Sequence, residues 1–340
     1  MARRSIGAPP FHDARSTSSG EDTMLLYALK RLLHVIPVAI GVSIVCFMLI
    51  HIAPGDPLAA ILPSDASADL QTQMRSFYGL DRPLPIQYAL WAWHALHGDL
   101  GNSIASGRPV LNEILDASVN SIILALAAAV IGFVAGSSLG FLAGVFRGSW
   151  VDRLASAVSM LGVSVPHYWL GMVLVIAFSV TLGWLPAMGG GPEGSAGRTL
   201  SWAYLQFLIL PAVTMSVIPM GIIARTIRSL VADILSQDFT QALAAKGLMT
   251  PQILRHVVRN AAPTALSVMG LQLGYLLGGS ILIETVFSWP GTGFLLNGAI
   301  FTRDLPILQG TILVLAMFFV FLNLVVDVLQ SAIDPRIQRS

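Results

Sequence analysis

Few residues of this chain have the type and spacing that chemistry requires. The chain has two lysines: Lys30 follows Leu29 and Lys246 follows Ala245, so neither completes the Gly-Lys-Ser/Thr of a phosphate-binding loop. The His-Glu-x-x-His pattern of zinc peptidases is also missing. The sequence therefore predicts a subunit without an ATPase or other catalytic site of its own.

Two histidines share a spacing that metal sites use. His94 and His97 lie three residues apart, which would place both rings on one face of a helix. A closed metal site needs three or four ligands, and no third ligand accompanies the pair. We therefore predict no metal site and no cofactor bound by this chain.

Three polar residues in apolar surroundings are candidates for a translocation path, because such groups are costly inside a membrane. Gln272 could hydrogen-bond a peptide-like cargo, or it could bond a neighbouring helix. Glu284 lies near one end of an apolar run and could form an outer gate or its support. His167 follows Pro166, where we expect a kink, because proline removes a backbone hydrogen bond.

These residues must be positioned by membrane helices. Hydrophobic residues make up 55% of the chain and charged residues 11%, and the mean hydropathy is +0.74, values that indicate an all-α, polytopic membrane protein. A spanning helix needs about 20 mostly apolar residues. Six runs satisfy this length, at about 33–53, 118–146, 165–184, 204–226, 264–286 and 307–329.

The basic residues favour one orientation of the six spans. With the N-terminus inside, 14 of the 19 Lys and Arg residues fall on the cytosolic side and five fall outside. This distribution obeys the positive-inside rule, and the reverse orientation would violate it. We therefore expect both termini, and the polar segment that precedes the fifth span, to face the cytosol.

The spans divide the chain into five parts. Residues 1–23 are rich in Ser, Arg and Gly without an apolar core, which predicts a disordered tail and no cleaved signal peptide. The other predicted parts are a first transmembrane helix at 24–53, an external ectodomain at 54–115, a five-helix core at 116–331 and a cytosolic tail at 332–340. In the ectodomain, residues 65–77 and 86–97 are predicted to form amphipathic helices, the second with aromatic anchors at the membrane interface: Tyr88, Trp91 and Trp93.

Two series of glycines predict tight helix packing. In a membrane, residues without bulky side chains let helix backbones approach closely. One series would pack either within the bundle or against a partner subunit. The series are Gly132, Gly136, Gly140, Gly144 and Gly148 in the second span, and Gly270, Gly274 and Gly278 in the fifth.

A polar segment between the fourth and fifth spans, placed at 228–263, is predicted to bind another protein. Residues 238–246 favour a short helix, Gly247 a left-handed corner, and Thr250 the N-cap of a second helix. Arg255 and Arg259 lie one turn apart and could pair with acidic groups of a partner or with lipid phosphates. The residues predicted to couple to a partner are Asp238, Gln241, Ala242, Ala245, Lys246, Gly247, Arg255 and Arg259.

This segment resembles the coupling loop of the permease subunits of binding-protein-dependent ABC importers. It departs from the general Glu-Ala-Ala signature and is similar to that of the di- and oligopeptide branch, through Asp238-Phe239, Ala244-Ala245-Lys246-Gly247-Leu248 and Arg259-Asn260-Ala261-Ala262-Pro263. Other motifs of the B-type permease of that branch occur in order: Ala53-Pro54-Gly55-Asp56-Pro57, Gly79-Leu80-Asp81-Arg82-Pro83, Gly98-Asp99-Leu100-Gly101, Glu284 to Gly291, Arg303-Asp304-Leu305-Pro306 and Asp334-Pro335-Arg336-Ile337.

The resemblance implies a type I ABC importer permease fold in a bacterial inner membrane. It implies a C-type permease as heterodimer partner, two ATP-binding subunits that use ATP and Mg, and an extracytoplasmic solute-binding protein; no nucleic acid is expected. The cargo could be a dipeptide, an oligopeptide, glutathione or a nickel chelate. The other function class left open is an autonomous channel or proton-coupled transporter, which would need a relay of intramembrane acids or histidines.

Overall fold

The computed structural model of the chain describes residue 33 and residues 36–48, 67–77, 81–192 and 201–333. Within these residues the chain is helical, and the only extended pairing is an isolated bridge between Asn102 and Pro109. The predicted tail 1–23, and all but two residues of the predicted tail 332–340, lie outside the described residues. The all-α class is confirmed for the part described.

The described part of the predicted first span is the helix Ile36–Met48. Two helices of the predicted ectodomain follow, α2 Ala68–Phe77 and α3 Leu84–Leu96. The remaining elements are α4 Val110–Val145, α5 Trp150–Ser164, α6 His167–Leu174, the π-helix η2 Val175–Thr181, α7 Trp202–Leu235, α8 Asp238–Ala245, α9 Thr250–Gly278, α10 Ile281–Val286, α11 Thr292–Thr302 and α12 Leu305–Ile333.

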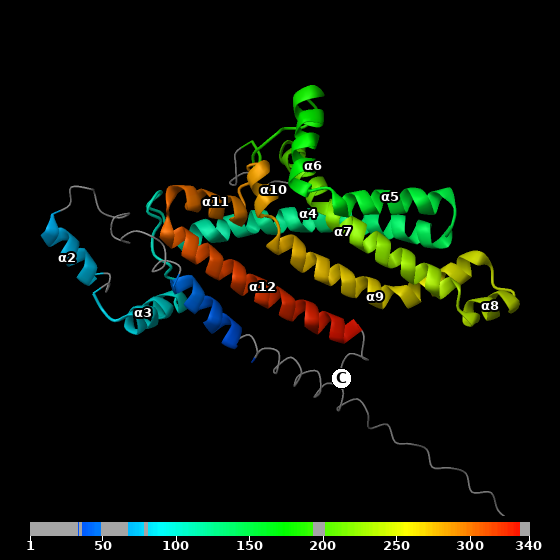
Figure 1. Ribbon diagram of the computed structural model, residues 1–340, viewed down its shortest axis with the longest axis horizontal. Helices are drawn as coiled ribbons and strands as arrows, with labels where there is room; N and C mark the ends of the chain where they lie inside the picture. Colours follow the sequence, from blue (N-terminus) through cyan, green and yellow to red (C-terminus); the bar gives the residue numbers. More distant parts are fainter. Residues whose placement is uncertain (1–32, 34–35, 49–66, 78–80, 193–200, 334–340) are drawn as a thin grey trace, which may run out of the picture.

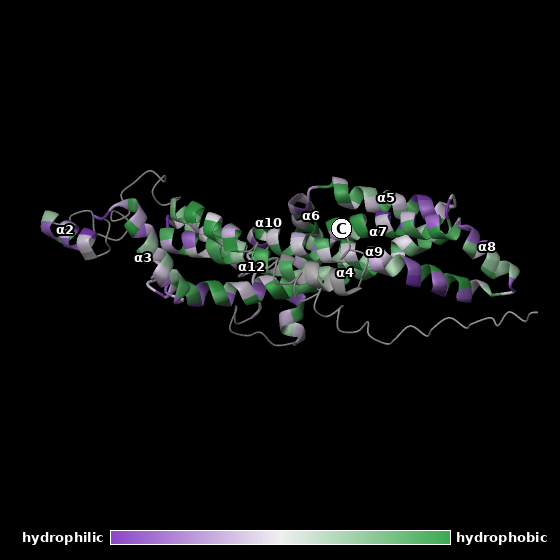
Figure 2. Ribbon diagram, turned by 90° about the horizontal axis from the view of Figure 1, so that it is seen from below, coloured by the Kyte–Doolittle hydropathy of each residue, from purple (hydrophilic) through white to green (hydrophobic). Residues whose placement is uncertain are grey.

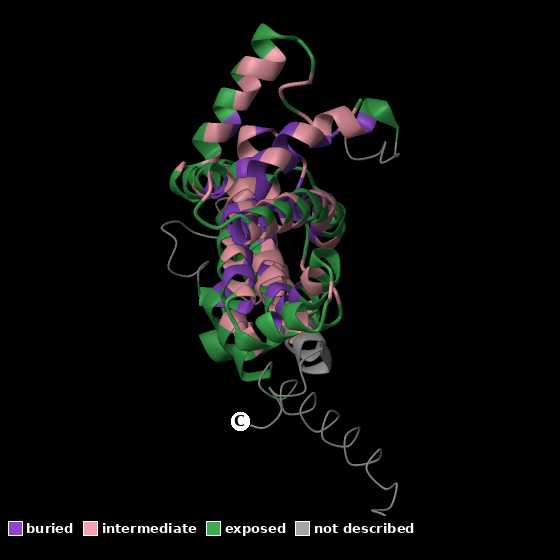
Figure 3. Cartoon of the chain, turned by 90° about the vertical axis from the view of Figure 1, so that its right-hand side faces the viewer, coloured by how far each residue is buried: buried purple, intermediate pink, exposed green. Residues whose placement is uncertain are grey.

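The helices form an elongated bundle around α4 and α7, which lie side by side along its length (Figure 1). Helices α2 and α3 lie at one end, the ectodomain end, and α8 lies at the opposite end, the coupling end. Hydrophilic residues are concentrated towards these two ends, and the stretch between them is mainly hydrophobic (Figure 2). Seen along the bundle, buried residues lie in the interior and exposed residues on the outside (Figure 3).

Helices α4 and α7 exceed the thickness of a membrane. Their 36 and 34 residues correspond to about 54 and 51 Å at 1.5 Å per residue, against about 30 Å of hydrocarbon. Both are long and apolar enough to cross a membrane, and they contain almost all of the predicted second and fourth spans. The extra length of α7 includes residues 228–235, which we had assigned to the coupling loop.

The glycines of α4 form the contact with α7. A Cβ atom built at Gly132 would lie 2.9 Å from the carbonyl oxygen of Ser216, and one at Gly136 would lie 2.7 Å from that of Met220. Such short distances mean that the two backbones touch, as the small-residue pattern predicts. Gly140 and Gly144 continue the same contact, against Ala224 and Val231. This glycine seam therefore packs within the chain.

Gly148 does not belong to this seam, contrary to our prediction. Helix α4 ends at Val145, and Gly148 adopts a φ of +83° in the turn to α5. In the second series, on α9, Gly274 is buried and Gly270 is half-buried, whereas Gly278 is exposed. A Cβ at Gly278 would lie 3.9 Å from the Phe319 ring on α12, an ordinary van der Waals distance, so the spacing there is not tight.

The chain bends sharply at the start of the predicted third span. Helix α5, which we expected to be a cytosolic approach to this span, packs alongside α4 and α7. The chain is extended at Val165, and α6 with η2 then runs at 102° to α5 (Figure 1). The predicted kink before His167 is confirmed. Because of this kink, residues 165–184 run in a different direction from α5. The reason is that Pro166 cannot continue the hydrogen bonding of α5.

The predicted fifth span is broken, which the sequence analysis did not anticipate. Helix α9 begins at Thr250 and continues through Pro263 to Gly278, so the second half of the predicted coupling loop is part of the same helix as the span. The break comes at Gly279 and Ser280, before the short helix α10. The sequence analysis also gave no helix between the last two spans, where the structure has α11.

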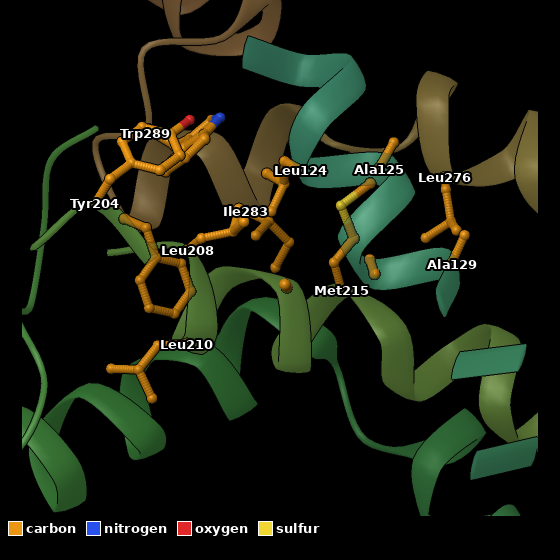
Figure 4. Close-up of a cluster of buried hydrophobic side chains, with 13 residues drawn as sticks. Leu124, Ala125, Ala129, Tyr204, Leu208, Leu210, Met215, Leu276, Ile283 and Trp289 are labelled. Atoms are coloured by element: carbon orange, nitrogen blue, oxygen red, sulfur yellow. The ribbon is translucent and has the colours of Figure 1, made fainter. Parts of the chain in front are cut away.

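The largest core cluster lies where α4, α7, α9 and α10 meet (Figure 4). The rings of Tyr204 and Trp289 are 6.0 Å apart, and the indole nitrogen of Trp289 donates a hydrogen bond to the carbonyl oxygen of Asn120 at 3.0 Å. Trp289 is fully buried. This cluster fixes the segment after α10 against the two long helices.

The ectodomain aromatics have two roles. The Tyr88 hydroxyl lies 2.7 Å from the Ser43 hydroxyl, and the rings of Tyr88 and Trp91 contact Phe47 at centroid distances of 5.5 and 5.9 Å. These two residues of α3 therefore pack against the first helix. Trp93 remains 63% exposed, as the predicted interfacial anchor would be.

Candidate functional site

The site predicted to couple to a partner is a protruding hairpin at the coupling end, formed by α8 and the loops around it. The sequence of the short helix α8 favours its formation. Asp238 lies in the first turn of α8 and Lys246 comes directly after the last turn, so both charges complement the helix dipole. The residues between them include alanines, which favour helix. We call residues 236–249 the coupling hairpin.

The hairpin is joined to the bundle through Thr240. This is the only buried residue of α8, and its hydroxyl donates a hydrogen bond to the carbonyl oxygen of Ile234, near the end of α7, at 2.9 Å. Because the bond spans a sharp reversal of the chain, it fixes the start of α8 relative to α7.

The predicted corner at Gly247 is confirmed. Gly247 has a φ of +84°, a conformation that residues with a side chain rarely adopt, and an added Cβ would meet nothing within 4 Å. We predicted Thr250 as the N-cap of the next helix, and this prediction is wrong. Its N-cap is Met249, and the Gln252 side chain accepts a hydrogen bond from the Met249 N–H at 2.9 Å.

The start of α9 presents two different faces. Val257 is fully buried and Ala261 is 5% exposed, and both pack against α7 in a second apolar cluster. Arg255 and Arg259 lie on the opposite side and are exposed. All eight residues predicted to couple to a partner are exposed: Asp238, Gln241, Ala242, Ala245, Lys246, Gly247, Arg255 and Arg259.

Two apolar residues extend this surface and were not among the predicted site residues. Met249 is 73% exposed and Phe239 is 36% exposed. Exposed large apolar residues beside polar ones are typical of protein interfaces. The sequence signal that could have identified them is their position in an otherwise polar segment, where Phe239 follows Asp238 and Met249 precedes Thr250.

The sequence analysis also missed a partly buried ion pair at the coupling end. Asp152, in the first turn of α5, is 4% exposed and binds the guanidinium of Arg228, on α7, through both carboxylate oxygens. The N–H of Gly148 donates a third hydrogen bond to Asp152 at 2.9 Å. Nothing in the sequence brings these residues together, because they lie 76 positions apart along the chain.

The structure places the path candidates in three different settings. Glu284 is fully buried and accepts hydrogen bonds from Ser121 at 2.7 Å and from the backbone N–H groups of Gly293 and Phe294 at 2.6 and 3.2 Å. It thereby joins α10 to α4 and to the first turn of α11. We had expected Glu284 to lie at the membrane interface, and this is wrong. Glu284 can be buried because three hydrogen-bond donors of this chain satisfy its carboxylate.

Gln272 and His167 have no comparable network in the described part of the chain. The side-chain oxygen of Gln272 is buried in α9 without a hydrogen-bond partner among the described residues. His167 is half-buried at the first position of α6, beside the bend, and its ring centroid lies 6.4 Å from that of Tyr168. Within the region described, no hydrogen bond joins Gln272, His167 and Glu284 to one another.

The described residues contain no group of three His, Cys, Asp or Glu side chains that could hold a metal ion. His94 lies 3.3 Å from Asp99, and His97 bonds the carbonyl oxygen of Trp93 at 2.7 Å. The stretch Gly136 to Gly140 matches the Gly-x-Ser-x-Gly pattern of hydrolases, but it lies within α4 and not at a strand-to-helix turn. The geometry of the described part is thus that of a membrane bundle with a protruding hairpin.

Comparison with known proteins agrees with this geometry. Residues 136–339 match the family described as binding-protein-dependent transport system inner membrane component, and residues 24–125 match the N-terminal family of the same membrane components. The chain is 40% identical over 316 residues to the glutathione transport system permease protein GsiC of Salmonella typhimurium and to that of Escherichia coli K12. In both cases 93% of this chain and 99% of the relative are covered.

A solved structure shares the fold. A chain of the MetNI methionine ABC transporter, in an inward-facing conformation, superimposes with a TM-score of 0.52 at 18% identity, covering 65% of this chain and 96% of that one. This likeness supports the type I permease fold. The two family matches and the relatives at 40% identity show that the chain belongs to the binding-protein-dependent transport system inner membrane components, as a permease subunit of an ABC importer.

Proposed function

We propose that the coupling hairpin, together with the exposed face of α9 around Arg255, is the docking surface for the ATP-binding subunits. The observation that carries this proposal is that every predicted coupling residue lies outside the core, in or beside a hairpin held by one buried side chain, Thr240. Phe239 and Met249 supply the apolar anchors that interfaces use. ATP-driven closure of those subunits then moves α8, and with it α7.

The rest of the assembly follows from this role. The chain pairs with a C-type permease, takes cargo from an extracytoplasmic binding protein, and depends on two ATP-binding subunits that hold ATP and Mg. It has no catalytic site of its own. In this proposal it crosses the inner membrane six times with both termini in the cytosol, an orientation supported by the basic residues near the coupling end, such as Arg147, Arg153 and Arg225.

The cargo we propose is glutathione or a short peptide. This proposal rests on the 40% identity, over almost the whole chain, to permeases named for glutathione transport. The amide oxygen of Gln272, which is buried and has no hydrogen-bond partner among the described residues, supports a path that offers a hydrogen-bond acceptor to peptide N–H groups. Glu284 then acts as the support of an outer gate, because its oxygens are already engaged within the chain.

The test is reconstitution of the complete complex in liposomes. Both permeases, the ATP-binding subunits and the binding protein are incorporated, and uptake of labelled glutathione, dipeptides and a nickel chelate is measured with ATP supplied to the ATP-binding subunits. We expect ATP-dependent uptake of glutathione or a peptide that requires the binding protein. Uptake of the nickel chelate alone would overturn the cargo, and uptake by the chain alone without ATP would overturn the importer mechanism.

A further inference from the structure

The ion pair between Asp152 and Arg228 fixes two helices that the sequence places far apart. Asp152 accepts hydrogen bonds from the Nε and Nη2 atoms of Arg228, from the Gly148 N–H at 2.9 Å and from the Ser156 hydroxyl at 3.3 Å. Both carboxylate oxygens are thus used. A two-pronged contact between a guanidinium and a carboxylate fixes direction as well as distance.

The pair lies between the coupling hairpin and the bend at the start of the predicted third span. Arg228 is on the last part of α7, whose end is bonded to α8 through Thr240 and Ile234. Asp152 is in the first turn of α5, whose other end is the bend at Val165. The pair therefore links the helix that carries the hairpin to the helix that leads to α6.

Apolar packing at this level is incomplete. Towards the middle of the bundle, α5 packs closely on α7: a Cβ at Gly221 would lie 2.6 Å from the Ser159 carbonyl oxygen, and one at Gly162 would lie 3.0 Å from the Val217 side chain. Between this contact and the ion pair is a cavity of about 300 Å³ between α4, α5 and α7. Its lining includes small residues such as Gly140, Ala155 and Ala224 as well as the larger side chains of Met160 and Arg228. The polar contact therefore ties α5 to α7 at the coupling end, where helix packing does not.

We propose that Asp152 and Arg228 are positioning residues of the transport cycle, which transmit the movement of α8 from α7 to α5 and so to the bend before α6. This inference rests on the proposed docking of the ATP-binding subunits at the hairpin. Asp152 is 4% exposed, so removing Arg228 alone would leave a buried carboxylate without its charged partner and damage folding. Replacing both residues with neutral ones leaves no unpaired charge. The double variant Asp152→Asn with Arg228→Gln is therefore the informative one.

The first measurement separates uptake from ATP hydrolysis in the reconstituted complex. In the double variant we expect the ATP hydrolysis stimulated by the binding protein to stay within about twofold of wild type, while uptake per ATP falls about tenfold. The charge-exchanged variant, Asp152→Arg with Arg228→Asp, is expected to recover part of that ratio. An unchanged ratio in the neutral double variant, or parallel losses of hydrolysis and uptake, would overturn the proposal.

The second measurement does not depend on cargo. With Cys46→Ser, spin labels at Ala157 on α5 and Asp233 near the end of α7, both exposed and both outside the proposed docking surface, report the distance between these helices as a non-hydrolysable ATP analogue binds to the complex. We expect a constant distance in wild type, because the two helices move together, and a changed distance in the neutral double variant. If the distance changes equally in both, the pair transmits nothing, whether or not the unaltered complex imports glutathione.

A matched control is available at the ectodomain end. Arg108 Nε lies 3.5 Å from Glu113 Oε1, and the Arg108 side chain is 62% exposed. The double variant Arg108→Gln with Glu113→Gln is expected to leave uptake per ATP unchanged. A loss equal to that of the Asp152 and Arg228 variant would show that the assay responds to any lost ion pair, and would remove the support for a specific joint.

Discussion

At the ectodomain half of the molecule, Glu284 and Asp304 are both buried, and each accepts three hydrogen bonds from the same chain. In the coupling hairpin, Asp238, Gln241 and Lys246 are all exposed. Buried carboxylates with partners fix one arrangement of helices, because moving them leaves polar groups unpaired. Exposed polar side chains, in contrast, can form hydrogen bonds or ion pairs with another molecule. The difference teaches that the region around Glu284 and Asp304 is built to keep its shape and that the coupling hairpin is built to be held by a partner.

The largest effect is expected at the corner of the hairpin. Gly247→Val places a β-branched residue at a φ of +84°, a strain of about 1–2 kcal/mol, and redirects α8 relative to α9. We expect normal membrane insertion but loss of co-purified ATP-binding subunits and of uptake. Gly101→Val is the matched control, since Gly101 has a φ of +81° and equally open surroundings in the predicted ectodomain. Full uptake by the Gly247 variant would break the comparison.

The next effect tests the rigid region around Glu284. Glu284→Ala leaves Ser121 and the N–H groups of Gly293 and Phe294 without their acceptor, at a cost of about 3 kcal/mol or more. Thermal unfolding of the purified complex in detergent should show this as a lower Tm. Asp238→Ala, which removes an exposed acid, is expected to leave the Tm unchanged, and an equal drop for both variants would contradict the contrast.

A smaller loss of stability is expected in the glycine seam. Gly136→Ala puts a methyl group 2.7 Å from the Met220 carbonyl oxygen, so α4 and α7 must separate at a cost of about 1–3 kcal/mol. The same thermal measurement applies. In Gly298→Ala the added methyl group meets nothing within 4 Å, and this variant should unfold like the wild type. Unchanged stability of the Gly136 variant would show that the seam adjusts freely.

Phe239, the exposed aromatic residue of the coupling hairpin, tests whether this region serves binding and not stability. Phe239→Ala should weaken binding of the ATP-binding subunits by about 1–2 kcal/mol, the usual range for an interface anchor, without lowering the Tm of the permease. Binding is measured by titrating those subunits onto immobilised permease. Phe301→Ala, at an 81% exposed position on α11, should bind them normally; weaker binding there would point to a general loss of structure.

The smallest effect is expected for the two arginines of α9. Exposed ion pairs contribute about 1 kcal/mol or less, so Arg255→Ala with Arg259→Ala should reduce affinity for the ATP-binding subunits several-fold at low salt and hardly at all at high salt. The titration is repeated in detergent and in vesicles with anionic lipid. An effect confined to the vesicles would assign these arginines to lipid phosphates.

Some features could be predicted because they depend on local chemistry. The alanines, Asp238 and Lys246 favour α8, the left-handed corner requires a residue such as Gly247, and Pro166 breaks the third span. These depend on a few neighbouring residues. The four-residue spacing of glycines likewise predicted the close contact of α4, because spacing alone puts them on one face.

Other features depend on contacts that no local pattern encodes. The burial of Glu284 needs the turn of α11, and the pairing of Asp152 with Arg228 needs α5 to lie against α7. Pro263 was expected to end the polar segment, yet the helix continues through it. A proline only removes one hydrogen bond, and a helix packed on both sides of it can continue.

The unbroken course of α9 has a mechanical consequence. Its 29 residues form a rod of about 44 Å at 1.5 Å per residue, with Arg255 near one tip and Gln272 towards the other. Rotating such a rod by about 5° about one tip sweeps the opposite tip through about 4 Å, comparable to the width of a single amide group. In the proposed import cycle, a small movement of the coupling end of α9 would therefore shift Gln272 far enough to open or close the proposed path.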